Sequence, residues 1–175
     1  MNTANKLTLF RVVLIPVFLV CLYLTFPGHL LVALVIFVVA SLTDFADGYI
    51  ARHYNQVTDF GKFMDPLADK LLVMSAMAWF VQIGWMPGWV FFIVIARELA
   101  VTGLRLIAVE QGQVIAAGKS GKVKTASTMV GICFMLLFPH PTVILVCVAV
   151  ILVTTVYSGI EYFMQNKDVL LHGAR

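Results

Sequence analysis

Three long stretches of this chain contain no Asp, Glu, Lys or Arg: residues 12–43, 71–96 and 125–160. One helix that crosses the hydrocarbon core of a bilayer needs about 20 apolar residues, so each stretch is too long for a single span. Each stretch also has prolines, glycines or both near its middle, and these residues mark turns. We therefore predict an all-α integral membrane protein with six transmembrane helices arranged as three hairpins. The expected helices cover residues 7–25, 30–50, 62–83, 88–109, 121–138 and 142–164.

Composition and charge placement agree with a membrane protein of one domain, residues 1–175. The chain is 61% hydrophobic and 12% charged, whereas a soluble domain carries about 25% charged residues. Every Lys and Arg lies at the helix ends opposite the hairpin turns, and positively charged helix ends stay on the cytoplasmic side. We therefore expect a multi-pass protein of the cell membrane with both termini in the cytoplasm. The basic residues are few and scattered, so no nucleic-acid partner is expected.

Four aspartates lie near the cytoplasmic ends of the predicted helices: Asp44 and Asp47 on the second, Asp65 and Asp69 on the third. Spacings of three and four residues put both carboxylates of a pair on one helix face. Burying one carboxylate in a membrane costs about 2.5 to 3.5 kcal/mol on insertion scales, and like charges held close together cannot all stay ionised unaided. One or two hard divalent cations such as Mg²⁺ would resolve this conflict, since they bind carboxylate oxygens together with substrate phosphates. We therefore predict a metal site in a cavity open to the cytoplasm.

Glycines and an arginine accompany these carboxylates. Gly48 and Gly61 would let a phosphate or nucleotide approach the backbone, and Arg52, one turn beyond Gly48, offers a fork of donors to a phosphate. A cation combined with an arginine is what phosphoryl-group chemistry requires. Outside this clamp, Asn5 and Thr8 could either cap the first helix or contact a ligand.

A second, basic cluster falls on the fourth predicted helix and the start of the fifth. Arg97 and Arg105 are eight residues apart, so they lie on roughly the same helix face two turns apart. Arg97 sits inside an apolar segment, where anchoring at the membrane surface is not enough reason for a charge. A soluble anionic substrate would explain Arg97, Arg105 and Lys122 together, and Glu98 could orient one of the arginines.

The acidic segment resembles the signature of the CDP-alcohol phosphotransferase family at every fixed position: Asp44-x2-Asp47-Gly48-x2-Ala51-Arg52-x8-Gly61-x3-Asp65-x3-Asp69. Eight fixed residues make this motif highly specific, and six helices also suit that family. The resemblance extends along the chain to the phosphatidylglycerophosphate synthase branch through residues 5–18, 65–73, 96–105, 121–125 and 158–163. One departure is Thr128, where many relatives carry a glutamine.

The resemblance implies roles for the candidate residues. Asp44, Asp47 and Asp65 would ligate two divalent ions, Mg²⁺ or Mn²⁺, with Asp69 near the second ion and also acting as the general base. Arg97, Arg105 and Lys122 would hold the phosphate of glycerol 3-phosphate. The family also implies a homodimer. The CDP moiety would be held by Asp47, Gly48, Ala51, Arg52, Gly61 and Asp65.

The function that the resemblance implies is transfer of the phosphatidyl group from CDP-diacylglycerol to sn-glycerol 3-phosphate, which gives phosphatidylglycerol phosphate and CMP. An alternative within the family is another acceptor, as in synthesis of phosphatidylinositol phosphate or cardiolipin. A different class of protein, a divalent-metal transporter, would also use intramembrane carboxylates. Transporter sites, however, lie near the bilayer midplane between inverted repeats, and here the carboxylates lie at helix ends on one side.

Overall fold

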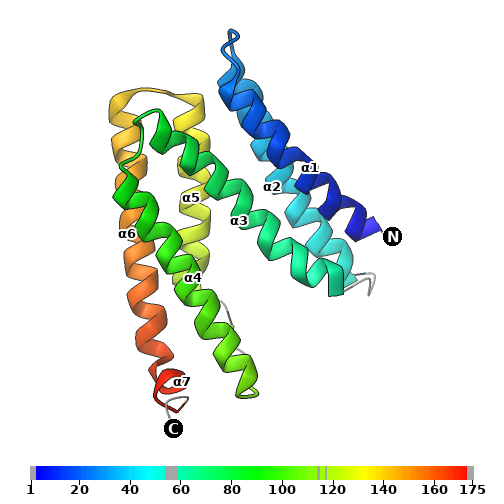
Figure 1. The fold of residues 1–175 in the computed structure, drawn as a ribbon, viewed down its shortest axis with the longest axis vertical. Coiled ribbons are helices and arrows are strands. Elements are labelled where there is room, and N and C mark those ends of the chain that lie inside the picture. Colours follow the sequence, from blue (N-terminus) through cyan, green and yellow to red (C-terminus); the bar gives the residue numbers. More distant parts are fainter. Residues whose placement is uncertain (1–2, 54–58, 114, 117, 173–175) are drawn as a thin grey trace. The chain divides into compact units, whose positions relative to one another are not determined.

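The computed structural model describes the backbone of residues 3–53, 59–113, 115–116 and 118–172, and their side chains except at residues 3–6, 44–53, 59–63 and 170–172. The described residues are helical apart from short connections, and no strand occurs among them, which confirms the all-α prediction. The described residues form seven helices, which Figure 1 labels. They are α1 (Thr3–Tyr23), α2 (His29–His53), α3 (Asp59–Gln82), α4 (Gly88–Glu110), α5 (Lys119–Leu137), α6 (Pro141–Gln165) and α7 (Lys167–His172).

The predicted turn signals separate the helices as expected. Gly28 and Gly84 adopt φ values of +83° and +78°, a left-handed conformation that glycine reaches without steric cost. Pro141 opens α6, and the His140 side chain caps that helix by accepting a hydrogen bond from the Thr142 backbone N–H at 3.3 Å. The six helices were therefore predicted at the right places, whereas the short α7 was not expected.

The first helix corrects one prediction. α1 begins at Thr3, so Asn5 and Thr8 both lie inside the helix and neither is its N-terminal cap. The Thr8 side chain is instead buried, with 1% of its surface exposed.

The chain divides into two compact units by its contacts. The first comprises residues 1–80 and 135–139, and in it α1 and α2 pack along each other. Phe18 of α1 and Phe37 of α2 are buried with their ring centroids 5.7 Å apart, within the range of favourable aromatic contacts. The expectation of a single domain stays a prediction.

The second unit comprises residues 81–134 and 140–175, and α4 packs against both α6 and α7 in it. α5 and α6 pack closely at Gly131. A Cβ atom added there would come within 3.1 Å of Ile151 Cδ1 on α6. The hydroxyl groups of Ser127 on α5 and Thr154 on α6 are hydrogen-bonded at 3.0 Å. This unit therefore brings together the helices that carry the predicted basic cluster.

Among the described residues, α6 alone is both long and apolar enough over its length to cross a membrane. Two shorter apolar segments, Leu7–Tyr23 and His29–Thr43, lie in α1 and α2. Large apolar side chains are also exposed on other helices, including Phe92 on α4 and Phe134 on α5.

Candidate functional site

Most of the predicted acidic site falls on residues whose side chains lie outside the described part of the chain. These are Asp44, Asp47, Gly48, Ala51 and Arg52 near the end of α2 and Gly61 near the start of α3. Their roles in binding metal and the CDP moiety therefore stay predictions.

Asp65 and Asp69 lie one turn apart on α3, as their spacing predicts. Thr8 on α1 donates a hydrogen bond of 2.8 Å from its hydroxyl to Asp65 Oδ1. This bond joins residues 57 positions apart, so it fixes the direction of the Asp65 carboxylate from a different helix. Arg11, one turn beyond Thr8, is fully buried. The sequence predicts Arg11 only as a charge at the cytoplasmic end of a helix, because the spacing of charges does not show which of them are buried.

The carboxylate of Asp65 is a ligand type that suits a hard divalent cation. Carboxylate oxygens are the ligands such ions prefer, and a hydroxyl that donates to a ligating carboxylate is the kind of outer contact that orients metal ligands. Among the side chains that the structure describes, no group of three or more Asp, Glu, His or Cys residues gathers. The side chains of Asp44 and Asp47 lie outside the described part of the chain. Asp65 with its partner Thr8 is therefore the part of the predicted metal site whose contact the structure gives.

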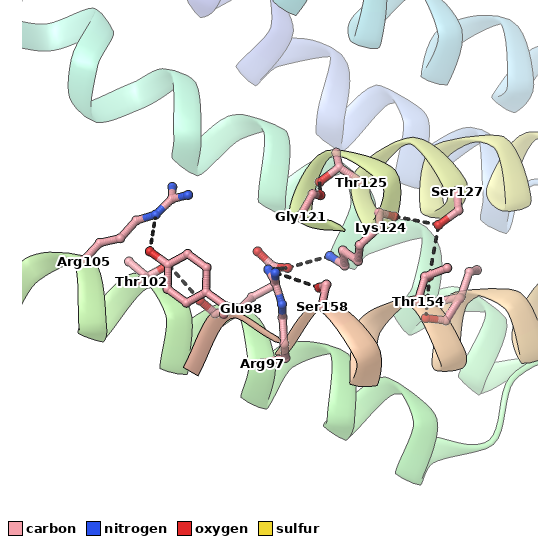
Figure 2. A network of polar contacts seen from close by, with 12 residues as sticks. Arg97, Glu98, Thr102, Arg105, Gly121, Lys124, Thr125, Ser127, Thr154 and Ser158 are labelled. Atoms are coloured by element: carbon pink, nitrogen blue, oxygen red, sulfur yellow. Dashed lines mark hydrogen bonds and ion pairs between the residues drawn. The ribbon is translucent and has the colours of Figure 1, made fainter. Parts of the chain in front are cut away.

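The basic cluster is built around Glu98 on α4 (Figure 2). Glu98 Oε1 accepts from Arg97 Nη1 at 3.0 Å and from Lys124 Nζ on α5 at 2.5 Å. Only 12% of the Arg97 side chain, 16% of the Glu98 side chain and 6% of the Lys124 side chain are exposed. Arg97 Nη2 also donates to Ser158 Oγ on α6 at 2.8 Å. One carboxylate therefore links a buried lysine and a largely buried arginine from neighbouring helices.

Arg105, two turns beyond Arg97 on α4, has a different partner. Its Nε donates a hydrogen bond of 3.0 Å to the hydroxyl of Tyr162 on α6, and the guanidinium carbon lies 5.7 Å from the ring centroid. Tyr162 is buried whereas Arg105 is exposed. The buried tyrosine therefore holds an arginine whose side chain is exposed.

Lys122 and Lys124 of α5 differ in their exposure. Lys122 is exposed, whereas Lys124, two positions further along α5, is buried and belongs to the ion network. The sequence predicts roles for Arg97, Glu98 and Arg105 but assigns none to Lys124, Ser158 or Tyr162. Lys124 is one of three lysines in the first turns of α5, and the charge pattern could not tell which of them faces α4.

Chemically, this cluster suits an anion with several oxygen acceptors. Arg97, Arg105 and Lys124 supply three positive charges against the one carboxylate of Glu98. Arginine presents a planar fork of donors that matches phosphate geometry. The carboxylate keeps the two buried cations together, which like charges would otherwise oppose.

Comparisons with known proteins show the family of the chain. The family described as CDP-alcohol phosphatidyltransferase matches residues 1–157. A Bacillus subtilis protein named CDP-diacylglycerol–glycerol-3-phosphate 3-phosphatidyltransferase is 40% identical over 97% of both chains. A Salmonella paratyphi A protein of the same name is 39% identical over 97% of both chains. A Mycobacterium tuberculosis protein named probable phosphatidylglycerophosphate synthase is 41% identical over 92% of this chain and 79% of its own. The chain therefore belongs to the CDP-alcohol phosphatidyltransferase family.

Proposed function

We propose that this protein transfers the phosphatidyl group of CDP-diacylglycerol to sn-glycerol 3-phosphate and releases CMP. The observation that carries the proposal is the similarity to relatives named for this reaction, which runs over nearly the whole chain. The cluster of Arg97, Arg105 and Lys124 supports a phosphorylated acceptor, because its three positive charges exceed the one negative charge of Glu98. The lipid product is phosphatidylglycerol phosphate.

The reaction exchanges one phosphorus–oxygen bond for another. The acceptor hydroxyl oxygen attacks the phosphorus that bears the diacylglycerol, and the bond from that phosphorus to CMP breaks, with its electron pair leaving on CMP. Asp69 takes the proton of the attacking hydroxyl as general base. Asp47, Gly48, Ala51, Arg52, Gly61 and Asp65 hold the CDP moiety. Positioning and charge neutralisation supply most of the rate, because a carboxylate near cations is a modest base.

Divalent ions belong to this proposal. Asp44, Asp47, Asp65 and Asp69 would hold two ions, Mg²⁺ or Mn²⁺, which when bound neutralise the charge of the diphosphate. The Thr8 hydroxyl supports the assignment of Asp65, because its hydrogen bond fixes the direction of the carboxylate, as outer contacts of metal ligands do.

The acceptor phosphate is held by Arg97, Arg105 and Lys122. Arg97 is the deepest of the three, and two hydrogen-bond partners on different helices fix its direction. Arg105 and Lys122 are exposed, so both can reach a water-soluble substrate.

We also propose that α1 to α6 all cross the cell membrane, with both termini and the active site on the cytoplasmic side. Exposed apolar side chains on these helices support lipid contact, among them Leu42, Phe92, Phe134 and Leu145. The positive-inside distribution of Lys and Arg supports the orientation. A homodimer, implied by the family resemblance, is part of the same proposal.

The test is CMP release by the purified protein in detergent with CDP-diacylglycerol and Mg²⁺. Glycerol 3-phosphate, inositol phosphate, serine and phosphatidylglycerol are supplied in separate reactions, with Asp69→Asn as the control variant. We expect release only with glycerol 3-phosphate, and none from Asp69→Asn. Release with a different acceptor would keep the family and overturn the acceptor. If the folded protein releases no CMP with any of these acceptors and any divalent metal, the transferase is contradicted, and metal flux in liposomes would then test a transporter.

A further inference from the structure

One face of α6 carries two buried hydroxyl groups that each hold an arginine of α4. Ser158 and Tyr162 lie one turn apart on α6, and Arg97 and Arg105 lie two turns apart on α4. Ser158 Oγ accepts from Arg97 Nη2 at 2.8 Å, and the Tyr162 hydroxyl accepts from Arg105 Nε at 3.0 Å. Both acceptors are buried, with 0% and 5% of their surfaces exposed. The two cations are therefore directed by one neighbouring helix.

A glycine between these two hydroxyls makes room for the first arginine. A Cβ atom at Gly159 would lie 3.2 Å from Arg97 Cγ, which is closer than ordinary van der Waals contact. On the other side, a Cβ atom at Gly121 of α5 would lie 3.7 Å from Arg97 Nη2. The Arg97 side chain therefore runs between α5 and α6, with its stem against Gly159 and its head at Ser158.

The second arginine is held by a side chain that is itself rigidly packed. Tyr162 belongs to a buried apolar cluster with Val101, Leu104 and Ala108 of α4 and Val169 of α7. Its hydroxyl therefore has a fixed position, whereas an exposed arginine has many rotamers and loses that freedom when it binds a ligand. The hydrogen bond removes part of this loss before any ligand arrives.

We propose that Ser158, Gly159 and Tyr162 are positioning residues that set the direction of Arg97 and Arg105 toward the acceptor phosphate. This inference rests on the proposed function and adds residues to its acceptor site. None of the three needs to contact the substrate. Their effect is on discrimination: they favour a phosphorylated acceptor over the same alcohol without its phosphate.

The first test compares Tyr162→Phe and Ser158→Ala with the wild type, using glycerol 3-phosphate and glycerol as acceptors. Each variant removes one hydroxyl and leaves the apolar contacts of the side chain in place. We expect the KM for glycerol 3-phosphate to rise about tenfold, as for the loss of a hydrogen bond to a charged group. The KM for CDP-diacylglycerol and the melting temperature should stay unchanged. The ratio of kcat/KM for glycerol 3-phosphate over glycerol should fall by about the same factor.

The matched control for Tyr162→Phe is Tyr157→Phe on the same helix, because Tyr157 is 64% exposed. Gly159→Ala offers a second route, since it should displace Arg97 and raise the KM for glycerol 3-phosphate. Its control is Gly103→Ala on α4, where an added Cβ atom meets nothing within 4 Å. Both control variants should match the wild type in KM and in acceptor discrimination.

Unchanged KM and unchanged discrimination in both Tyr162→Phe and Ser158→Ala would overturn the inference. So would a loss of activity that is equal for both acceptors and accompanied by a lower melting temperature, since that pattern indicates a structural role. Failure of the proposed function looks different: the wild type itself would show no preference for glycerol 3-phosphate. In that case, isothermal titration of the wild type and Tyr162→Phe with inorganic phosphate decides whether these residues position an anion site, and equal affinities would overturn it.

Discussion

At the scale of single residues, the basic cluster depends on Glu98. Its Oε1 atom accepts from both Arg97 and Lys124, and these three side chains are largely buried. Burying a pair of charges gains little compared with apolar packing, but removing one partner leaves the other charge without compensation. Two cations share this one carboxylate, so its loss should affect stability more than the loss of either cation.

We therefore predict that Glu98→Gln lowers the free energy of unfolding by about 3 kcal/mol, the lower end of the range found when a buried ion pair loses one partner. Glutamine keeps the shape and one acceptor oxygen, so the change isolates the charge. Thermal unfolding in detergent measures the effect, and Glu110→Gln, at an exposed position on the same helix, is the control. Equal stability of the two variants would mean that the ion network does not hold α4 and α5 together.

For the proposed metal site, the residue to test is Thr8, whose hydroxyl donates to Asp65. Removing it in Thr8→Val should weaken Mg²⁺ binding about tenfold, because outer contacts of metal ligands typically contribute this much. The checks are the Mg²⁺ dependence of activity and the rise in melting temperature that Mg²⁺ produces. Thr25→Val, at an exposed turn position, should leave both unchanged. An unaltered Mg²⁺ dependence in Thr8→Val would argue against Asp65 as a ligand.

At the scale of elements, the sequence predicted where the helices lie better than how they face one another. The uncharged stretches and their proline and glycine turns located α1 to α6, because both signals are local in the chain. The partners of Arg97 and Arg105 could not be found in this way. Ser158 and Tyr162 lie near the end of a helix that carries no basic residue, and only the packing of α6 on α4 shows that they meet the arginines.

Packing between α5 and α6 gives a prediction at this scale. Gly131 lets the helices approach, since an added Cβ atom would come within 3.1 Å of Ile151 Cδ1. Gly131→Val should therefore lower the free energy of unfolding by about 2 kcal/mol through overpacking. The same change at Gly103 meets open space and is the control in thermal unfolding. If both variants lost the same stability, valine in a helix, and not the α5–α6 contact, would be the cause.

At the scale of the whole molecule, the proposed topology has six membrane spans, and the active site lies on the cytoplasmic side. The exposed apolar side chains and the one-sided distribution of Lys and Arg point the same way. The metal-binding roles of the acidic residues of α2 stay predictions, because their side chains fall outside the described part of the chain. The family assignment does not depend on them, since the match covers residues 1–157.

Cysteine labelling tests the orientation. In a variant without Cys21, Cys133 and Cys147, His140→Cys at the α5–α6 turn should react with a membrane-impermeant maleimide in intact cells. Gln113→Cys, after α4, should react only once the membrane is permeabilised. The reversed pattern, or labelling of both in intact cells, would contradict the proposed topology.

The most direct measurement of the central claim is mass spectrometry of the lipid product. The purified protein receives CDP-diacylglycerol, Mg²⁺ and an equimolar mixture of glycerol 3-phosphate, inositol phosphate and serine. The account predicts phosphatidylglycerol phosphate as the dominant new lipid, formed in step with CMP. A dominant lipid carrying inositol phosphate or serine, or CMP release without any new phospholipid, would contradict it.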